Sequence, residues 1–515
     1  MKTTRGAILL LLSVSACTVA PGTAPVPARL GANFSVIPLP ASIELDTSRM
    51  FRVDTATTIY VDENADSTTL AVGNYLRTML TPIVGHEVQR AGAASMLAPH
   101  PIRLAIDPAS ASGNEGYKLD VGPDAISIVA KTPAGLFYGV QTLRQLMPVS
   151  VEYVAAVGRR LTVPSGHIVD SPRYEWRGMM IDVSRHFLPP RDVKRFIDVL
   201  ALYKINRLHL HLSDDQGWRI EIKSRPNLTS VGGLTQVGGA AGGFFTQDEY
   251  KDIVAYAASR FMTVVPEIDM PAHLNAALVS YPEMTCDHVA PPPFPFIGAP
   301  RNTVLCVDSA NVYPIIEDIV REISAITPGP YYHIGGDEVP RLTTEQYHTF
   351  IERMQSIVNA NGKTMIGWAD IAPANLSPST IVQSWHNDPA ELQTARGGKV
   401  IMSPGPKAYL DMKYDSTTIL GLKWGGFITP EVAYDWDPAT YKPGIPESAI
   451  LGVEYPLWAE TVVRAEDYEF MAFPRIIAMA EIGWTPQSRR SWNDFDKRLQ
   501  YGRKRLTALG VNAGY

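Results

Sequence analysis

The sequence predicts an α/β protein in which a (β/α)8 TIM barrel follows a smaller α+β domain. The chain has 515 residues, of which 45% are apolar and 19% charged, a balance typical of a folded globular protein. In residues 171–515, eight strand-like segments alternate with mostly helical stretches, whereas residues 36–170 contain short strands and one or two helices. The alternation and its length match a barrel with long insertions.

Residues 1–16 have the pattern of a secretory signal peptide. Lys2 and Arg5 precede an apolar run from Ala7 to Leu12, and small residues follow. The run is too short for a membrane-spanning helix, which needs about 20 residues. We therefore expect an exported protein.

Cys17 directly follows the small residues of this segment, as in the lipobox of bacterial lipoproteins. Residues 17–35 are rich in Ala, Pro and Gly, which suits an extended tether. The sequence thus predicts lipidation of Cys17 and anchoring in the periplasm or outer membrane of a bacterium, with several acyl chains providing a stable anchor. The alternative is a plain signal peptide with an incidental cysteine.

Residues 36–170 are predicted to form an α+β accessory domain. Residues 134–146 place Leu136, Val140 and Leu143 at helical spacing. The segments that alternate like strands are 58–61, 102–106, 117–121 and 125–129.

Residues 171–515 are predicted to form the barrel and the catalytic domain. The expected strands are 178–183, 205–212, 262–268, 331–335, 364–368, 381–385, 399–403 and 449–453. Active sites of such barrels form at the C-terminal ends of the strands. Acidic, basic or aromatic residues follow every expected strand, namely Arg185, Asp214, Asp215, Asp269, His273, Asp337, Glu338, Trp368, Trp385, Tyr409, Asp411, Trp458 and Glu460.

This combination of side chains indicates a sugar site. Indole rings cover the apolar face of a pyranose, while carboxylates and guanidinium groups hydrogen-bond its hydroxyls. Asp337 and Glu338 follow Gly335 and Gly336, which permit a sharp turn. Adjacent carboxylates in a closed site cannot both ionise freely, so one of them suits a general acid. An exposed Asp-Glu turn or a helix cap is the alternative for the dipeptide alone.

His209 and His211 raise the alternative of a metal site, because alternate strand residues face the same side. The further ligands of amidohydrolase barrels, whose His-x-His motif this resembles, cannot be placed in the sequence. We therefore expect packed histidines inside the barrel, and neither a metal nor another cofactor.

Two composition features concern partners and covalent bonds. Lys and Arg total 46 against 52 Asp and Glu, a net charge of −6 that argues against a nucleic-acid partner. Cys286 and Cys306 bracket a Pro-rich loop in an exported chain, which favours a disulfide over two separate buried thiols.

The segment Tyr332-His333-Ile334-Gly335-Gly336-Asp337-Glu338 closely resembles the H-x-G-G-D-E motif of family 20 glycoside hydrolases, the β-N-acetylhexosaminidases. Further segments of similar sequence follow in the family's order, and they are 134–143, 178–185, 209–218, 266–273, 409–411 and 457–460. Two departures are Ala369, where the family usually has an acidic residue, and Ala272, where it usually has Gly.

The resemblance implies retaining, substrate-assisted hydrolysis of terminal N-acetylglucosamine or N-acetylgalactosamine through an oxazolinium intermediate. It assigns acid-base chemistry to Glu338 and orientation of the acetamido group to Asp337, with Tyr409 donating to the acetamido oxygen. Arg185, Asp411 and Glu460 would bind the outer hydroxyls, and Trp368, Trp385 and Trp458 would wall the pocket. His273, with Asp269, Asp214 or Asp215, would tune Glu338.

The expected partners are oligosaccharides or glycoconjugates that end in an N-acetylhexosamine, such as chitooligosaccharides, with the membrane contacted only through the lipid. Two alternatives stay open. One is a catalytically silent glycan-binding lipoprotein, which would not need the Asp337-Glu338 pair. The other is a family member that releases a disaccharide or transglycosylates.

Overall fold

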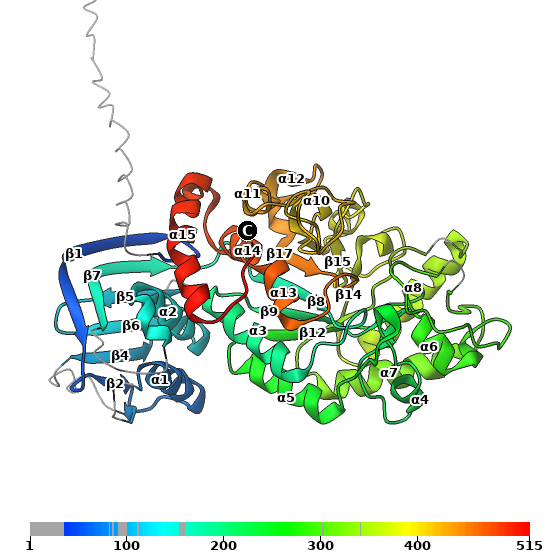
Figure 1. Ribbon diagram of the computed structural model, residues 1–515, viewed down its shortest axis with the longest axis horizontal. Coiled ribbons are helices and arrows are strands. Elements are labelled where there is room, and N and C mark those ends of the chain that lie inside the picture. Colours follow the sequence, from blue (N-terminus) through cyan, green and yellow to red (C-terminus); the bar gives the residue numbers. More distant parts are fainter. Residues whose placement is uncertain are drawn as a thin grey trace, which may run out of the picture.

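The computed structural model describes residues 35–81, 83–84, 87–90, 100–110, 113–153, 161–300, 303–339 and 341–514. The predicted signal peptide, Cys17 and the tether up to residue 34 lie outside these residues. Two domains lie side by side in Figure 1, the N-terminal one in blue and cyan and the barrel in green to red. Within the described residues, no helix is long and apolar enough to cross a membrane.

The N-terminal domain is built on a seven-stranded mixed sheet. Its strands lie in the order β1-β7-β5-β6-β4-β2-β3. Their bounds are β1 Ser42–Val53, β2 Thr58–Val61, β3 Gln89–Arg90, β4 Pro101–Ile106, β5 Tyr117–Val121, β6 Ile126–Ala130 and β7 Leu161–Asp170. The predicted strands and helix correspond to β2, β4, β5, β6 and α2 (Pro133–Leu146). Strands β1, β3 and β7 were not predicted, and the second helix, α1 (Ser67–Leu80), was not placed in the sequence.

Helix α2 begins where its sequence provides a cap. The hydroxyl of Thr132 accepts from the backbone N–H of Gly135, and Pro133 occupies the first turn, where no backbone donor is needed. Leu136, Val140 and Leu143 are fully buried among the apolar residues of the sheet. The helix therefore forms much of the core of this domain.

The second domain is a closed barrel of eight parallel strands. Starting from β8, neighbours follow in chain order, and β17 pairs with β8 to close the ring. The strands are β8 Trp176–Asp182, β9 Arg207–His211, β12 Thr263–Glu267, β13 Tyr331–His333, β14 Thr364–Trp368, β15 Ile381–Ser384, β16 Lys399–Met402 and β17 Ile450–Leu457. The predicted barrel is thus confirmed, with the last strand extending further than expected.

The longer helices of this domain lie around the barrel in Figure 1, except the last, which lies between the barrel and the N-terminal domain. They are α3 Pro190–Leu202, α5 Gln247–Ala258, α7 Val312–Ile326, α8 Thr344–Ala360, α13 Ala465–Ala472, α14 Arg475–Trp484 and α15 Trp492–Ala508. The connections also contain a two-stranded ribbon, β10 Ser213–Asp214 and β11 Gly217–Trp218, and six shorter helices. These are α4 Asn227–Ser230, α6 Asn275–Ser280, α9 Glu391–Ala395, α10 Gly405–Ala408, α11 Pro430–Tyr434 and α12 Pro438–Tyr441. The loop between α6 and α7 contains the predicted disulfide, in which Cys286 and Cys306 are bonded.

Buried polar contacts join the two domains. Asp170, the last residue of β7, lies 2.9 Å from Nζ of Lys204 of the barrel domain, and both side chains are fully buried. The indole N–H of Trp484, at the end of α14, donates to the same carboxylate at 2.9 Å. Arg505 of α15 pairs with Glu152 of the N-terminal domain. These contacts hold the barrel in one orientation against the accessory domain.

Candidate active site

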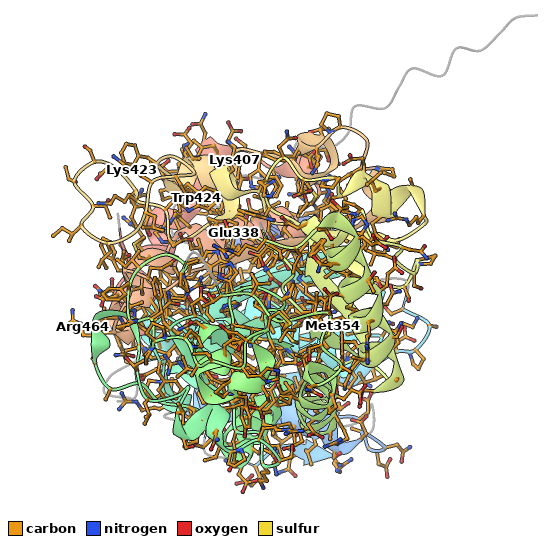
Figure 2. All side chains as sticks on the ribbon, turned by 90° about the vertical axis from the view of Figure 1, so that its right-hand side faces the viewer. Glu338, Met354, Lys407, Lys423, Trp424 and Arg464 are labelled. Atoms are coloured by element: carbon orange, nitrogen blue, oxygen red, sulfur yellow. A yellow bond between two sulfur atoms is a disulfide. The ribbon has the colours of Figure 1, made fainter. Side chains whose placement is uncertain are left out.

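A cavity of about 290 Å³ opens at the C-terminal ends of the barrel strands. Figure 2 looks onto this end of the molecule, with Glu338 and Trp424 close together near the middle of the view. The lining residues are Arg185, Asp214, Asp269, His273, Asp337, Glu338, Trp385, Tyr409, Asp411, Trp424, Trp458 and Glu460. The loops after seven of the eight strands contribute to this set, so the barrel brings together residues up to 275 positions apart in the chain, as the sequence predicted.

Two glycines shape the turn that presents Asp337 and Glu338. Gly335 and Gly336 adopt φ of +66° and +97°, which suit glycine. A Cβ on Gly335 would lie 1.8 Å from Oδ1 of Asp269, the atom that accepts from the N–H of Gly336 at 3.0 Å. Glu338 itself has a φ of +51°. The turn is therefore specified by close backbone approach, and it directs the two neighbouring carboxylates to different surroundings.

Asp337 is the buried member of the pair. Burial raises the pKa of Asp337 to about 7, and the charges of Asp370 and Glu338 act in the same direction. Its Oδ1 atom is buried and has no hydrogen-bond partner among the described residues. The side chain is thus suited to accept a hydrogen bond from a ligand in the cavity.

Glu338 is the exposed member, and its side chain is 59% accessible to solvent. Nε2 of His273 lies 3.3 Å from Oε2 of Glu338, and this contact holds the pKa of Glu338 below its ordinary value. His273 has a φ of +53°, also in the left-handed region. Non-glycine residues held in this region cluster at functional sites.

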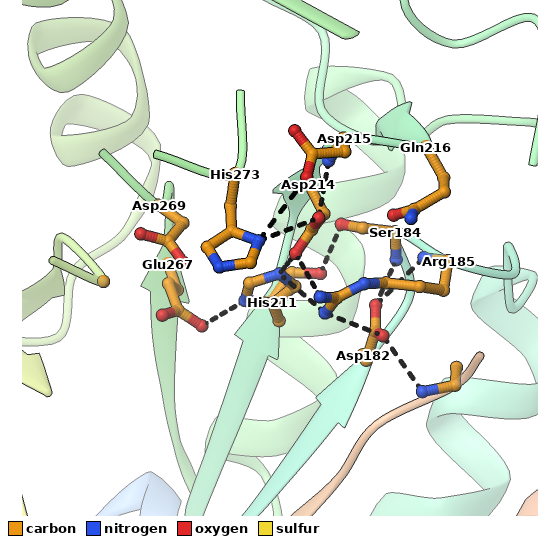
Figure 3. A network of polar contacts seen from close by, with 12 residues as sticks. Asp182, Ser184, Arg185, His211, Asp214, Asp215, Gln216, Glu267, Asp269 and His273 are labelled. Carbon is orange, nitrogen blue, oxygen red and sulfur yellow. Dashed lines mark hydrogen bonds and ion pairs between the residues drawn. The ribbon is translucent and has the colours of Figure 1, made fainter. Parts of the chain in front are cut away.

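The far side of His273 faces two aspartates. Nδ1 of His273 lies 3.4 Å from Oδ1 of Asp214 and 3.6 Å from Oδ2 of Asp215, as the dashed lines of Figure 3 trace. Burial disfavours the imidazolium, but the charge of Asp214 and the hydrogen-bond contacts with Asp214, Asp215 and Glu338 together outweigh burial and raise the pKa of His273 well above its ordinary value. Asp214, rather than Asp269, is therefore the main partner of His273.

Arg185 is held in the wall of the cavity by acidic partners. Its guanidinium pairs with Asp214 at 2.8 Å and with Asp182 at 3.3 Å, and its carbon lies 4.9 Å from the ring centre of Trp458. These contacts fix a cation beside the carboxylate of Glu460, whose Oε2 is buried without a partner among the described residues. The cavity therefore offers both donors and acceptors at this end.

Asp411 adds a further buried carboxylate. Burial raises the pKa of Asp411 well above its ordinary value, and the charge of Glu460 adds to the rise. Both of its carboxylate oxygens are buried without hydrogen-bond partners within the described part of the chain. Buried polar atoms without partners are costly, so these acceptors mark a place where a polar ligand would lower the free energy.

Aromatic rings form the remaining walls. The rings of Trp385 and Tyr409 are stacked at 6.2 Å, and Tyr409 lies 6.5 Å from Trp458. Trp368 does not line the cavity itself. It is buried against Trp458 at 5.8 Å, and its indole N–H donates to Glu267 at 3.0 Å.

Three residues of the site were not predicted. Trp424 lines the cavity with its ring 5.1 Å from that of Tyr409, but it lies in a loop well beyond the end of β16. Asp370 accepts from the indole N–H of Trp385 at 2.9 Å, and it stands next to Ala369, where the sequence departs from the family pattern. Glu267 is the last residue of β12, inside the similar segment 266–273, and no role was predicted for it.

His209 and His211 are both buried inside the barrel, as predicted, and they share Glu267 as a partner. Donor atoms of His209, Glu267 and His333 lie within 4.8 Å of one another, close enough to be considered as metal ligands. Nδ1 of His209 contacts Glu454 at 2.8 Å, and its Nε2 lies 3.0 Å from Glu267 without a hydrogen bond among the described residues. The two histidines therefore pack inside the barrel against acidic partners.

Comparisons with known proteins agree on one family. The sequence pattern of the catalytic domain of glycosyl hydrolase family 20 matches residues 174–487, and that of domain 2 of the same family matches residues 33–171. A β-N-acetylhexosaminidase of Cellulomonas fimi is 40% identical over 473 residues, which cover 91% of this chain and 93% of that protein.

Solved structures agree as well. The family 20 β-N-acetylhexosaminidase of Streptomyces coelicolor A3(2) superimposes with a TM-score of 0.88 at 43% identity, covering 94% of this chain and 98% of that one. A mutant β-hexosaminidase of Streptomyces plicatus, in complex with its product N-acetylglucosamine, superimposes equally well at 43% identity, covering 95% and 98%.

Proposed function

This chain belongs to glycosyl hydrolase family 20, and from that premise we propose that it removes terminal, non-reducing N-acetylhexosamine residues from glycans. The observation that carries the proposal is a sugar-sized cavity in which the paired carboxylates Asp337 and Glu338 stand beside aromatic walls and buried acceptors without partners. At about 290 Å³ the cavity is at the small end of ligand pockets, which suits one sugar ring and hence exo action.

Asp337 acts on the acetamido group in this proposal. Its buried carboxylate accepts from the acetamido N–H and opposes the positive charge that develops as the acetamido oxygen attacks C1. Tyr409, buried beside it in the wall, donates its hydroxyl to the attacking oxygen. The reaction then proceeds with retention through a cyclic oxazolinium.

Glu338 is the general acid and base of the reaction. As an acid it protonates the glycosidic oxygen, and as a base it activates the water that opens the oxazolinium. The exposure of Glu338 suits this role, because the leaving group and the incoming water both approach from the open side of the cavity. His273, 3.3 Å away, is the neighbour with which Glu338 shares its proton.

The outer hydroxyls of the sugar face the end of the cavity that lies opposite Asp337 and Glu338. Arg185 donates to them, and Asp411 and Glu460 accept, which would supply partners for carboxylate oxygens that have none in the described protein. Trp385 and Trp458 cover the apolar face of the ring. A silent glycan-binding protein would use the same walls but would not need a buried aspartate beside an exposed glutamate paired with histidine.

We also propose that Cys17 is lipidated and that the protein is anchored in the periplasm or outer membrane of a bacterium. The basic start, the short apolar run and the small residues before Cys17 support the proposal. Chitooligosaccharides and other glycans that end in N-acetylglucosamine are the proposed natural substrates.

Paired p-nitrophenyl β-glycosides test the proposed activity. We expect the N-acetylglucosaminide to be cleaved at least about 10³-fold faster, in kcat/KM, than the glucoside, because only the former carries the attacking acetamido group. Equal values on the two substrates would refute substrate assistance, and binding without turnover of either would support the silent glycan-binding alternative.

A further inference from the structure

Glu267 is a carboxylate buried in the interior of the barrel. It ends β12, it is fully inaccessible to solvent, and it is not among the residues that line the cavity. Burying a carboxylate is costly unless its oxygens are engaged by donors. Its position therefore calls for an explanation in terms of its partners.

Four rings surround the carboxylate of Glu267, and one of them is that of His333, whose Nδ1 lies 3.0 Å from Oε1. Its Oε2 atom contacts Nδ1 of His211 and lies 3.0 Å from Nε2 of His209, and its Oε1 atom accepts from the indole N–H of Trp368 at 3.0 Å. Trp368 in turn packs against Trp458, a wall of the cavity. One carboxylate thus holds both a histidine beneath the site and an indole behind its wall.

A continuous path of contacts leads from Glu267 to Glu338. Nε2 of His211 lies 2.9 Å from Oδ2 of Asp214, whose other oxygen faces Nδ1 of His273, and Nε2 of His273 faces Glu338. Figure 3 shows the part of this path from Glu267 through His211 and Asp214 to His273. Carboxylate and imidazole side chains alternate along this path, so the charge of each one affects whether the next one holds a proton.

His211 is the step that depends on Glu267. Both of its ring nitrogens face carboxylates, so it satisfies both only when both nitrogens carry protons. Burial opposes this state, but Glu267 and Asp214 together raise the pKa of His211 well above its ordinary value. The charged ring keeps Asp214 an acceptor, and Asp214 can then engage both Arg185 and His273.

We propose that Glu267 is a positioning residue for the acid-base step, which it serves by keeping His211 charged and thereby aligning Asp214, His273 and Glu338. The proposal rests on the proposed function, because it assigns Glu267 an effect on leaving-group protonation. Its effect passes through His211 and requires no contact with the sugar.

The test is Glu267→Gln in the full-length protein. A glutamine has one acceptor and one donor group, and the indole of Trp368 can only donate. The amide oxygen must therefore face Trp368, so the amide NH2 faces Nδ1 of His211 and leaves that ring neutral, with its proton on Nε2. Histidine-selective ¹⁵N NMR should show the loss of one imidazole N–H.

The kinetic readout is the dependence on the leaving group. For a substrate with a poor leaving group, such as chitobiose, kcat should fall at least about 10-fold, a part of the ~10² to 10⁴ that general acid catalysis contributes. For the 2,4-dinitrophenyl glycoside, which needs little protonation, kcat should fall less than about 3-fold. KM for both substrates should change little, because the sugar contacts are intact.

Glu454→Gln is the matched control. Glu454 is equally buried, and it also contacts a histidine and an indole, His209 at 2.8 Å and Trp176 at 2.9 Å. Its histidine does not contact Asp214, so this variant should keep the leaving-group dependence of the wild type. A double variant supplies a second control, because Glu267→Gln should have little further effect on chitobiose cleavage in a His273→Ala background.

The proposal would be overturned if Glu267→Gln lowered kcat equally for chitobiose and for the 2,4-dinitrophenyl glycoside. It would also be overturned if the effects of Glu267→Gln and His273→Ala on kcat were fully additive. If Glu267→Gln does not fold, His211→Gln decides in its place. That variant interrupts the same path and leaves Trp368 bonded, and an unchanged leaving-group dependence there would also overturn the proposal. Failure of the proposed function is distinguishable, because the wild type itself would then not cleave the N-acetylglucosaminides.

Discussion

At the scale of single residues, the site separates two carboxylates that are adjacent in the chain. Asp337 is buried and has a raised pKa, whereas Glu338 is exposed and has a lowered one. The difference arises from the turn at Gly335 and Gly336 and from His273, which, of the two carboxylates, contacts Glu338. Substitutions of the two should therefore have different effects.

Glu338→Gln should lower kcat by about 10² to 10⁴ on natural chitobiosides, because it removes general acid-base help while preserving the shape of the side chain. The loss of kcat in this variant should grow as the leaving group becomes poorer. The slope of log kcat against leaving-group pKa, measured with a series of aryl N-acetylglucosaminides, tests this dependence. A slope equal to that of the wild type would assign the proton transfer to another residue.

Asp337 should govern the acidic limb of the pH profile. Its pKa is raised to about 7 in the free protein, so kcat/KM should fall as the pH drops below about 7 and Asp337 takes up a proton. In the complex with substrate, the acetamido N–H donates to the ionised aspartate and lowers the pKa of Asp337, so the acidic limb of the kcat profile should lie at lower pH than that of kcat/KM. Asp337→Asn, measured over the same range, should lower kcat and kcat/KM together and lose this displacement between the two profiles.

If the acidic limbs of kcat and kcat/KM coincide in the wild type, or if the displacement persists in Asp337→Asn, the titrating group is not Asp337. A thiazoline mimic of the intermediate gives an independent check. Asp337→Asn should weaken its binding far more than it weakens the binding of free N-acetylglucosamine, because only the mimic reproduces the charged ring.

At the scale of structural elements, the turn after β13 determines the site. Gly335→Ala adds a Cβ that would lie 1.8 Å from Oδ1 of Asp269, in addition to the backbone strain at φ of +66°. We expect kcat to fall at least about 10²-fold, because a shift of this turn misplaces both carboxylates and misplacement by 1 Å can cost that much.

Gly362→Ala is the control for the strain alone. Gly362 has a similar φ of +73°, but its Cβ would meet nothing within 4 Å. Both variants should lose about 1 kcal/mol of stability from the left-handed backbone, measurable by denaturant unfolding. Only Gly335→Ala should lose activity, and normal kcat in that variant would show that the turn tolerates displacement.

The eight barrel strands could be predicted because each is a short, buried, apolar run followed by a polar loop. Strand β1 was missed because most of its residues are exposed and polar, so no alternation is visible. Trp424 was missed because only the folded loop brings it against Tyr409. Glu267 gave no signal either, since its role depends on rings from β9 and β14 that the chain alone does not bring together.

At the scale of the whole molecule, the predicted anchor should be separable from catalysis. Cys17→Ser should move the protein from the membrane fraction to the soluble fraction and leave kcat/KM unchanged, because the site is built entirely from barrel residues far along the chain. Fractionation with activity assays measures both. Mass spectrometry of the mature wild type that showed an unmodified Cys17 would contradict lipidation.

The pairing of Asp170 with Lys204 has a consequence for how the enzyme can be divided. A chain beginning after residue 170 would retain every residue of the cavity, yet it would leave the ammonium group of Lys204 and the indole N–H of Trp484 without their shared carboxylate. Removing one member of a buried ion pair costs about 3 to 5 kcal/mol, a large part of the stability of an ordinary domain. The two family domains are therefore distinct in sequence but should fold as one unit. We expect a single cooperative melting transition for the intact protein. The barrel domain produced alone should not fold into a functional enzyme.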